Sequence, residues 1–237
     1  MEYIHTLIYL CPLVFLAGFI DSVAGGGGTI SVPAFMLTGM PVHFAFGTNK
    51  LSMSFGTTIA AGRFIKNKAI DIRTAIISGV TSLIGAAIGS QIALLLDDRT
   101  FRLLLIIALP CVAVFLMFQK NTIQDSSSGR GSKNGNGRRN KSAHKTCSLR
   151  KSIILAAVIG ILIGTYDGII GPGTGTFAII AYNTIMKYDL KTASGNAKIL
   201  NLASNIASLA TFGKRGFVLC NCPHWRARFS HRSYPTR

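Results

Sequence analysis

The sequence predicts an all-α polytopic membrane helix bundle, built from two sequence-related repeats that carry glycine-broken helices. Three observations predict this fold class. The 237 residues are 49% hydrophobic with a mean hydropathy of +0.43, and 14% are charged, against roughly 25% in a soluble domain. Long apolar runs recur along the chain, and a motif in which an acid precedes glycines occurs twice.

Six segments are predicted to cross the membrane. The clearest is Ala75–Leu96, which contains no charged residue and exceeds the roughly 20 residues that a hydrocarbon core requires. A buried helix of a soluble protein would show a polar face with a period near 3.6 residues, and this segment shows none. The predicted spans are Ile4–Ala24, Phe44–Ile65, Ala75–Leu96, Phe101–Phe118, Ser152–Ile170 and Ala193–Gly213.

The net charge of +17 is concentrated in two places. Nine of the 25 Lys and Arg residues fall between Lys120 and Lys151, and six fall between Lys214 and Arg237. The first group lies in a stretch rich in Ser, Gly and Asn, a composition typical of a disordered linker. Because basic loops beside membrane spans mark the cytoplasmic side, we interpret the charge as a topology signal and expect no nucleic-acid partner.

The same rule predicts the orientation of a multi-pass membrane protein. The turn after the second span is basic, with Arg63, Lys66, Lys68 and Arg73. Two spans separate this turn from the linker, so both are predicted to be cytoplasmic, and the N-terminus with them. This parity requires Thr29–Leu37, which is too short to span alone, to form a short re-entrant helix.

The chain divides into four predicted segments. Residues 1–118 form a first repeat of about four spans, 119–151 a basic low-complexity linker, 152–218 an incomplete second repeat of about two spans, and 219–237 an aberrant basic tail. In the first repeat the turn at Arg63 leads into two further spans, whereas the matching turn leads into a tail without any apolar run. This break suggests a frameshift or a truncated reading frame; a genuine tail that binds anionic lipid is the alternative.

The motif that ends the first span recurs at the end of the fifth. "LAGFIDSVAGGGGT" at Leu16 matches "LIGTYDGIIGPGTGT" at Leu162 at a shift of 146 positions, which aligns Asp21 with Asp167. Further along, "AFGTNKLSMS" matches "ASGNAKILNL" at a shift of 148, which aligns Lys50 with Lys198. Duplicated segments with matched helix breaks indicate the central site of a transporter.

A physical argument connects these breaks to an anion site. Irregular backbone inside a bilayer is stable only where it faces protein or a wet cavity, and glycines allow a ligand to approach closely. The helix that restarts after such a loop presents free N–H groups and the positive end of its dipole. The candidate binding residues for a small anionic substrate are Gly25, Gly26, Gly27, Gly28, Thr48, Asn49, Lys50, Gly171, Gly173, Asn196 and Lys198.

The charged residues of the motif allow two interpretations. Asp21 and Asp167 are costly at membrane depth unless they are paired or hydrated. The hypothesis is that Lys50 and Lys198 supply positive potential for the anion, while the aspartates relay protons or brace the loops. The alternatives are that each aspartate only hydrogen-bonds the broken backbone and each lysine snorkels to the interface.

At these residues the chain resembles the sulfite exporter TauE/SafE family of membrane permeases. The resemblance is carried by "GFIDSVAGGGGTISVP", "FGTNKLSMSFGT", "GTYDGIIGPGTGTF" and "ASGNAKILNLASN", and it runs from about Leu10 to Val218 apart from the linker. It implies a polytopic inner-membrane protein that exports sulfite, sulfonates or related small organic anions. The same segments at 44–65 and 193–213 are rich in small and polar residues, so both are predicted to face the bundle interior.

The sequence also bears on two other classes of function. A nucleotide-binding enzyme is disfavoured, because "GGGGTIS" lacks the lysine of a G-x-x-x-x-G-K-[ST] loop. A truncated, non-transporting membrane remnant or subunit stays open as the alternative. The five cysteines form no framework, and "CNCPH" has no second pair at zinc spacing. No catalytic residue, metal or cofactor is therefore predicted, and the expected partners are the anion and the lipid bilayer.

Overall fold

The computed structural model describes residues 2–128 and 149–217, and all regular secondary structure in these ranges is α-helical. The predicted all-α class is therefore confirmed. The described ranges contain eight helices: α1 (Glu2–Ala24), α2 (Gly28–Leu37), α3 (Val42–Lys66), α4 (Ile72–Leu95), α5 (Asp98–Ser128), α6 (Leu149–Ile169), α7 (Thr174–Thr184) and α8 (Leu190–Lys214).

Six of these helices correspond to the six predicted spans, and the two short ones, α2 and α7, each follow a glycine segment. α2 coincides with the short helix that was expected at Thr29–Leu37. α5 continues past its predicted end at Phe118 to Ser128, so it takes up part of the range predicted as linker. The central part of that linker and the tail 219–237 lie outside the described residues.

The outer face of α4 is apolar and its inner face is small and polar. Large side chains on this helix are exposed, among them Ile76, Val80, Ile84, Ile88 and Leu95. Its buried positions hold Thr74, Ala75, Ser78, Gly79, Ser82, Gly85, Ala86, Gly89, Ser90 and Ala93. Such a distribution is the reverse of a water-soluble amphipathic helix, and it suits an outer face in contact with lipid.

Two stretches of the described chain are long and apolar enough to cross a membrane by length and composition alone. They are Ile72–Leu95 and Arg150–Ile169, which correspond to α4 and most of α6. The other long helices fall short of that criterion, and in α3 and α8 the reason is a polar face. Asn196, Asn201, Ser204, Asn205 and Ser208 of α8 are all buried, which confirms the prediction that 193–213 faces the interior.

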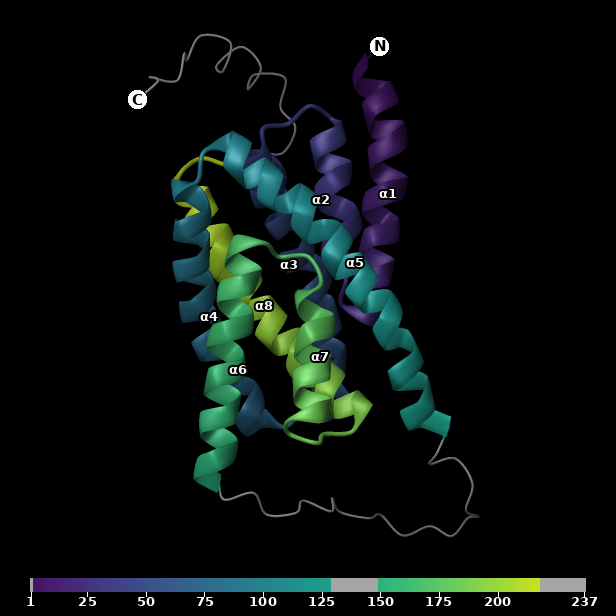
Figure 1. Ribbon diagram of the computed structural model, residues 1–237, viewed down its shortest axis with the longest axis vertical. Helices are drawn as coiled ribbons and strands as arrows, with labels where there is room; N and C mark the ends of the chain where they lie inside the picture. The colour runs from purple at the N-terminus through teal and green to yellow at the C-terminus, as the bar shows by residue number, and fades with distance from the viewer. Residues whose placement is uncertain (1, 129–148, 218–237) are drawn as a thin grey trace.

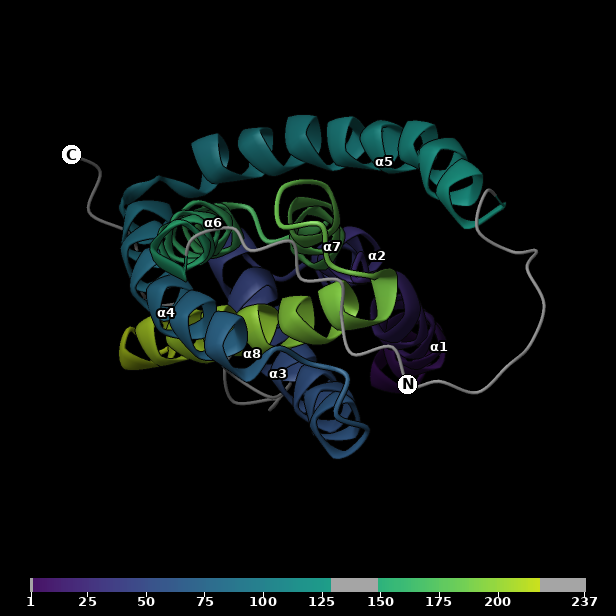
Figure 2. The ribbon, with the colours of Figure 1, turned by 90° about the horizontal axis from the view of Figure 1, so that it is seen from below.

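Glycines bring α4 and α6 into backbone contact. The two helices run side by side in both views (Figures 1 and 2). A Cβ added to Gly164 would lie 2.4 Å from the carbonyl oxygen of Ser82, and one added to Gly85 would lie 2.5 Å from that of Ile161. Small residues at a membrane helix interface permit this close approach, so α4 and α6 form a rigid pair beside α8.

The chain turns back at each glycine segment. α1 runs from one end of the molecule to its middle, where α2 begins and returns toward the same end; α6 and α7 do the same from the other end (Figure 1). The end that carries the start of α1 also carries the α4–α5 turn. The opposite end carries the α3–α4 turn, the α7–α8 turn and the start of α6 (Figure 1).

This arrangement corrects one part of the predicted orientation. The sequence placed the N-terminus on the same side as the basic linker, because α1 was counted as a complete crossing. In the structure α1 runs to the middle of the molecule, and α2 returns toward the end at which α1 starts (Figure 1). The start of α1 therefore lies at the end opposite the start of α6. The basic α3–α4 turn and the start of α6 do lie at one end, as the charge pattern predicted.

The glycine contact between α4 and α6 predicts a stability effect. Gly164→Ala should destabilise the protein by about 1–3 kcal/mol, because its methyl group would overlap the Ser82 carbonyl. Gly62→Ala in α3 is the matched control, since no atom lies within 4 Å of the added Cβ. Thermal unfolding of the detergent-solubilised variants measures both effects. Equal unfolding midpoints for the two variants would contradict the close approach.

Candidate functional site

The two glycine segments meet in the middle of the molecule. A Cβ added to Gly25 would lie 2.7 Å from the carbonyl carbon of Gly175, and one added to Gly28 would lie 3.3 Å from the Cα of Pro172. Gly25 and Gly171 also hold matching left-handed backbone conformations, with φ of 76° and 82°. Both the close approach and the positive φ require glycine, which explains why these residues stand at the two turns.

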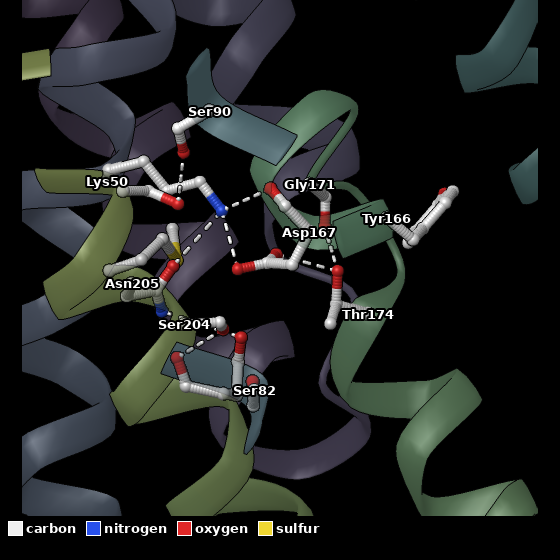
Figure 3. A network of polar contacts seen from close by, with 12 residues as sticks. Lys50, Ser82, Ser90, Tyr166, Asp167, Gly171, Thr174, Ser204 and Asn205 are labelled. Carbon is white, nitrogen blue, oxygen red and sulfur yellow. Dashed lines mark hydrogen bonds and ion pairs between the residues drawn. The ribbon is translucent and has the colours of Figure 1, made fainter. Parts of the chain in front are cut away.

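Lys50 of α3 reaches the second glycine segment. Its Nζ lies 2.7 Å from Oδ2 of Asp167, at the end of α6, and donates to the Asp167 carbonyl oxygen at 2.8 Å. A third acceptor is Oδ1 of Asn205 in α8, at 3.3 Å. Figure 3 shows the ammonium enclosed by these oxygens. Lys50 is 1% exposed, so its ammonium contacts these three oxygens inside the protein, two through hydrogen bonds and Oδ2 of Asp167 as an ion pair.

Lys198 of α8 makes the reciprocal contact with the first glycine segment. Its Nζ donates to the carbonyl oxygen of Asp21, at the end of α1, and lies 3.1 Å from Oδ2 of the same residue. Lys198 is 2% exposed. Each lysine therefore binds both the carboxylate and the carbonyl oxygen of an aspartate on the opposite part of the chain, and the snorkelling alternative is wrong for both.

The surroundings of Lys50 and Lys198 differ in the number of oxygen atoms close to the ammonium. Lys50 has three oxygen acceptors, whereas Lys198 has two among the described residues. The position that matches Asn205 at the shift of 148 is Thr57, whose hydroxyl donates back to the carbonyl oxygen of Met53 in its own helix. Among the described residues, the buried Lys198 ammonium therefore has no hydrogen-bond partner besides Asp21.

The aspartates also hold the loops, as one of the two interpretations proposed. Oδ1 of Asp21 accepts from the Gly27 amide at 3.4 Å, and Oδ1 of Asp167 accepts from the Thr174 hydroxyl at 2.7 Å. Each carboxylate thus joins a lysine to the first residues of a short helix. An oppositely charged partner and hydrogen bonds offset the cost of burying a carboxylate, which would be prohibitive for an isolated one.

Most of the remaining predicted site residues lie near the two glycine segments, and Asn196 lies at the start of α4. Asn49 is buried, and its Oδ1 accepts from the Ser31 hydroxyl of α2 at 2.5 Å. Thr48 is half-buried on the same turn of α3. Gly171 lies beside the Lys50 ammonium, and Gly173 caps α7 against Val112. Asn196 lies at another place: its Oδ1 accepts from the Asp71 amide, at the start of α4.

Sequence reasoning missed the acceptor that completes the Lys50 centre. Asn205 was predicted to face inward, but its contact with Lys50 follows from the register of α8 against α3, which the sequence pattern does not specify. Phe46 was also missed; its ring centroid lies 5.2 Å from the Lys50 ammonium, a cation–π distance. Lys50 follows Phe46 by one helical turn, and this spacing is the signal that would have identified the pair.

A second polar cluster joins the α3–α4 turn to the α7–α8 turn. The Tyr188 hydroxyl donates to Oδ2 of Asp71 at 2.5 Å and lies 2.7 Å from the Thr74 hydroxyl. Together with the Asn196 contact, these bonds close the end of the molecule that carries the start of α6. Burial raises the pKa of Tyr188 to about 12, and the bond to Asp71 and its charge act in the same direction.

No group of three or more His, Cys, Asp or Glu side chains that could hold a metal ion occurs among the described residues. Cys11 and Cys111 are free thiols on the exposed faces of α1 and α5. The pair in "CNCPH" lies outside the described residues.

The sequence model of the family described as Sulfite exporter TauE/SafE matches residues 10–222. The chain belongs to this family. The TauE/SafE match includes both glycine segments and both lysines, so the residues that meet in the centre of the structure all lie within it. No solved structure matches the chain.

This TauE/SafE protein matches curated relatives over most of its own length and over about three quarters of theirs. A probable membrane transporter protein of Haemophilus influenzae is 29% identical over 95% of this chain and 79% of its own. Probable membrane transporter protein ORF9 of a Sinorhizobium species is 29% identical, with 91% and 75% covered. Probable membrane transporter protein YfcA of Escherichia coli K12 is 29% identical, with 92% and 77% covered.

The buried Lys50–Asp167 pair predicts a strong and partner-dependent effect on stability. Lys50→Met should cost about 3–5 kcal/mol, because it leaves the Asp167 carboxylate buried without a counter-charge. The double variant Lys50→Met/Asp167→Leu should recover most of this loss, since an apolar pair of similar volume avoids that cost. Lys66→Met, at an exposed lysine of the same helix, is the control. Additive effects of the two substitutions on the unfolding midpoint would contradict the pairing.

The raised pKa of Tyr188 predicts a pH dependence of stability. An unfolded tyrosine titrates near pH 10, whereas the folded pKa of Tyr188 is about 12. The stabilising contribution of Tyr188 is therefore complete below about pH 10 and is lost as the pH rises toward about 12. Tyr188→Phe should remove this alkaline loss from the unfolding midpoint. Tyr9→Phe, at an exposed tyrosine of α1, should keep the loss; parallel curves for the two variants would contradict the assignment.

Proposed function

We propose that the chain is an integral membrane secondary transporter, not an enzyme, that moves small anions such as sulfite, sulfonates or related organic anions. The observation that carries the proposal is the pair of reciprocal ion pairs, Lys50–Asp167 and Lys198–Asp21, between two glycine turns. The names of its relatives support transport, and the family description supports sulfite as a candidate anion. The lipid-facing surface of α4 supports a site buried in the membrane.

The proposal includes an internal duplication. We infer that residues 1–118 and 152–218 are two related repeats in which a helix is broken by glycines. In support, matched residues make matched contacts: Lys50 with Asp167, and Lys198 with Asp21. Such inverted or related repeats place a substrate site near the bilayer midplane, between discontinuous helices.

We place the anion beside Lys198. An ammonium that is fully shared among protein oxygens attracts an anion weakly, and this is the condition of Lys50. Among the described residues, Lys198 has no hydrogen-bond partner besides Asp21, and the amides at the start of α2 lie beside the same carboxylate. A small oxyanion placed there would accept from the ammonium and from the positive end of the α2 dipole.

The same geometry suggests a role for protons. While Asp21 is ionised, it competes with the anion for the Lys198 ammonium. A proton on the Asp21 carboxylate removes this competition and leaves the ammonium to the anion. The aspartate then serves both as a loop brace and as a proton relay, and movement of the anion is coupled to the proton. Asp167 keeps the bracing role, because Asn205 and Phe46 retain Lys50 at its side.

We also propose the sidedness of the molecule. The end that carries the α3–α4 turn has exposed cations at Arg63, Lys66, Lys68 and Arg73, and α6 starts there with Arg150 and Lys151. An excess of Lys and Arg in short loops marks the cytoplasmic side. This end is therefore cytoplasmic, and the start of α1 lies on the other side of the inner membrane.

Flux into proteoliposomes tests the function. Wild-type protein should accumulate labelled sulfite or a sulfonate in vesicles, and an imposed proton gradient should change the rate. Lys198→Met should lower the flux by about 100-fold, which corresponds to the loss of about 3 kcal/mol of charge-assisted binding. Lys191→Met is the matched control, because it removes an exposed lysine from the same helix.

The outcomes separate the proposal from its alternative. Equal flux through Lys198→Met and Lys191→Met would contradict the assignment of the anion to Lys198. Wild-type protein that folds but neither moves nor binds sulfite, sulfate or sulfonates would support the alternative, a non-transporting membrane protein or subunit. Thermal unfolding in the presence of each anion distinguishes binding from misfolding in every variant.

A further inference from the structure

His43 occupies a junction of three helices at the end of the molecule opposite Tyr188. It lies on the first turn of α3 and is 6% exposed. Its Nδ1 lies 2.5 Å from Oδ1 of Asp98, the first residue of α5, and its Nε2 lies 3.1 Å from the carbonyl oxygen of Ala93 in α4. One imidazole ring thus joins the start of α3 to both sides of the α4–α5 turn.

Both ring nitrogens of His43 face oxygen acceptors. A neutral imidazole carries one N–H, so it can satisfy one of these acceptors while its other nitrogen turns a lone pair toward the second. The imidazolium carries two N–H groups and satisfies both, and it also pairs with the carboxylate of Asp98. The two oxygens therefore fit the two N–H groups of an imidazolium.

The surroundings of His43 leave Asp98 as its charged partner. The Asp98 side chain is 44% exposed, so the pair is open to water on one side. Phe101 and Phe217 pack against the ring, with centroid distances of 5.0 and 5.5 Å. The other charged residues near the start of α5 and the end of α8 are exposed: Asp97, Arg99, Arg102, Lys214 and Arg215. Asp97 accepts a hydrogen bond from the Thr100 amide.

Aromatic rings link this junction to the ion pair in the centre. Phe101 contacts His43 on one side and the Phe46 ring on the other, at a centroid distance of 5.5 Å. Phe46 in turn lies against the Lys50 ammonium. Phe46 and Phe101 are both fully buried in one cluster with Leu105 and Phe212. A shift of the start of α5 would therefore displace the packed side chains that contact Lys50.

We propose that His43 is a proton-binding residue that fastens the α4–α5 turn to α3, so that this end of the molecule is closed when His43 is protonated and loosens when it is not. Its role as a gate rests on the proposed transport function. The protonation-dependent contact itself does not, because it is a property of the folded chain without any substrate.

Hydrogen exchange measured by mass spectrometry tests the contact without any flux. The readout is the protection of amides at residues 93–101 in the detergent-solubilised full chain, at about pH 5.5 and about pH 8.5, the range in which imidazoles titrate. After correction for the chemical effect of pH on exchange, protection in the wild type should fall about tenfold between the two values, since a charge-assisted bond is lost.

Three variants make the test specific. His43→Gln should show low protection at both pH values, and Asp98→Asn should lose most of the pH response. Asp97→Asn, which changes a neighbouring carboxylate that does not contact His43, should respond as the wild type does. Protection that is independent of pH in the wild type, or a full response in Asp98→Asn, would overturn the proposal.

The test also separates this proposal from the transport proposal. A wild-type exchange response in protein that shows no flux would leave the His43 contact standing and would contradict transport. Flux in protein whose amides at residues 93–101 do not respond to pH would leave transport standing and would contradict the role of His43.

Discussion

Two buried lysine–aspartate pairs hold the centre of this protein together, and the arrangement of the helices depends on them. Each ammonium binds the carboxylate and the carbonyl oxygen at the end of a helix that precedes a glycine turn. Inside a protein of low dielectric, such a charge is tolerable only with a partner at contact distance. The two turns must therefore lie beside each other, and α3 and α8 must both pass through the middle of the bundle.

The rest of the structure packs closely around the two glycine turns. Glycines at Gly85 and Gly164 bring α4 and α6 into direct contact, and the buried small residues of α4 leave its large apolar side chains for the lipid. At one end, Tyr188 and Asp71 join the two adjacent turns; at the other, His43 joins three helices. The central charges are thus enclosed between two polar contacts, one at each end of the molecule.

Much of this architecture could be read from the sequence. The matched positions of Asp21 and Asp167, and of Lys50 and Lys198, predicted that these four residues share one site, because a charge inside a hydrocarbon span requires a partner. The pattern did not specify that each lysine would pair with the aspartate that is farther away in the chain.

This choice of partner depends on how α3 and α8 cross, which is determined by packing between residues far apart in the sequence. For the same reason the sequence did not place the start of α1 at the end opposite the start of α6 (Figure 1). The contact of Gly25 with Gly175 folds α2 back along α1, and no local signal reports this contact. Asn196 aligned with the glycine–lysine motif but lies beside Asp71, two residues before Lys198 in α8.

The most direct test of the central claim is a solid-state NMR measurement of the distance between lysine side-chain nitrogens and aspartate carboxyl carbons in the labelled full chain in lipid. The structure predicts two such correlations from buried lysines, one lost in Asp21→Asn and the other lost in Asp167→Asn. A spectrum without these correlations in the wild type, or with both unchanged in the two variants, would show that the ion pairs do not join the two glycine turns.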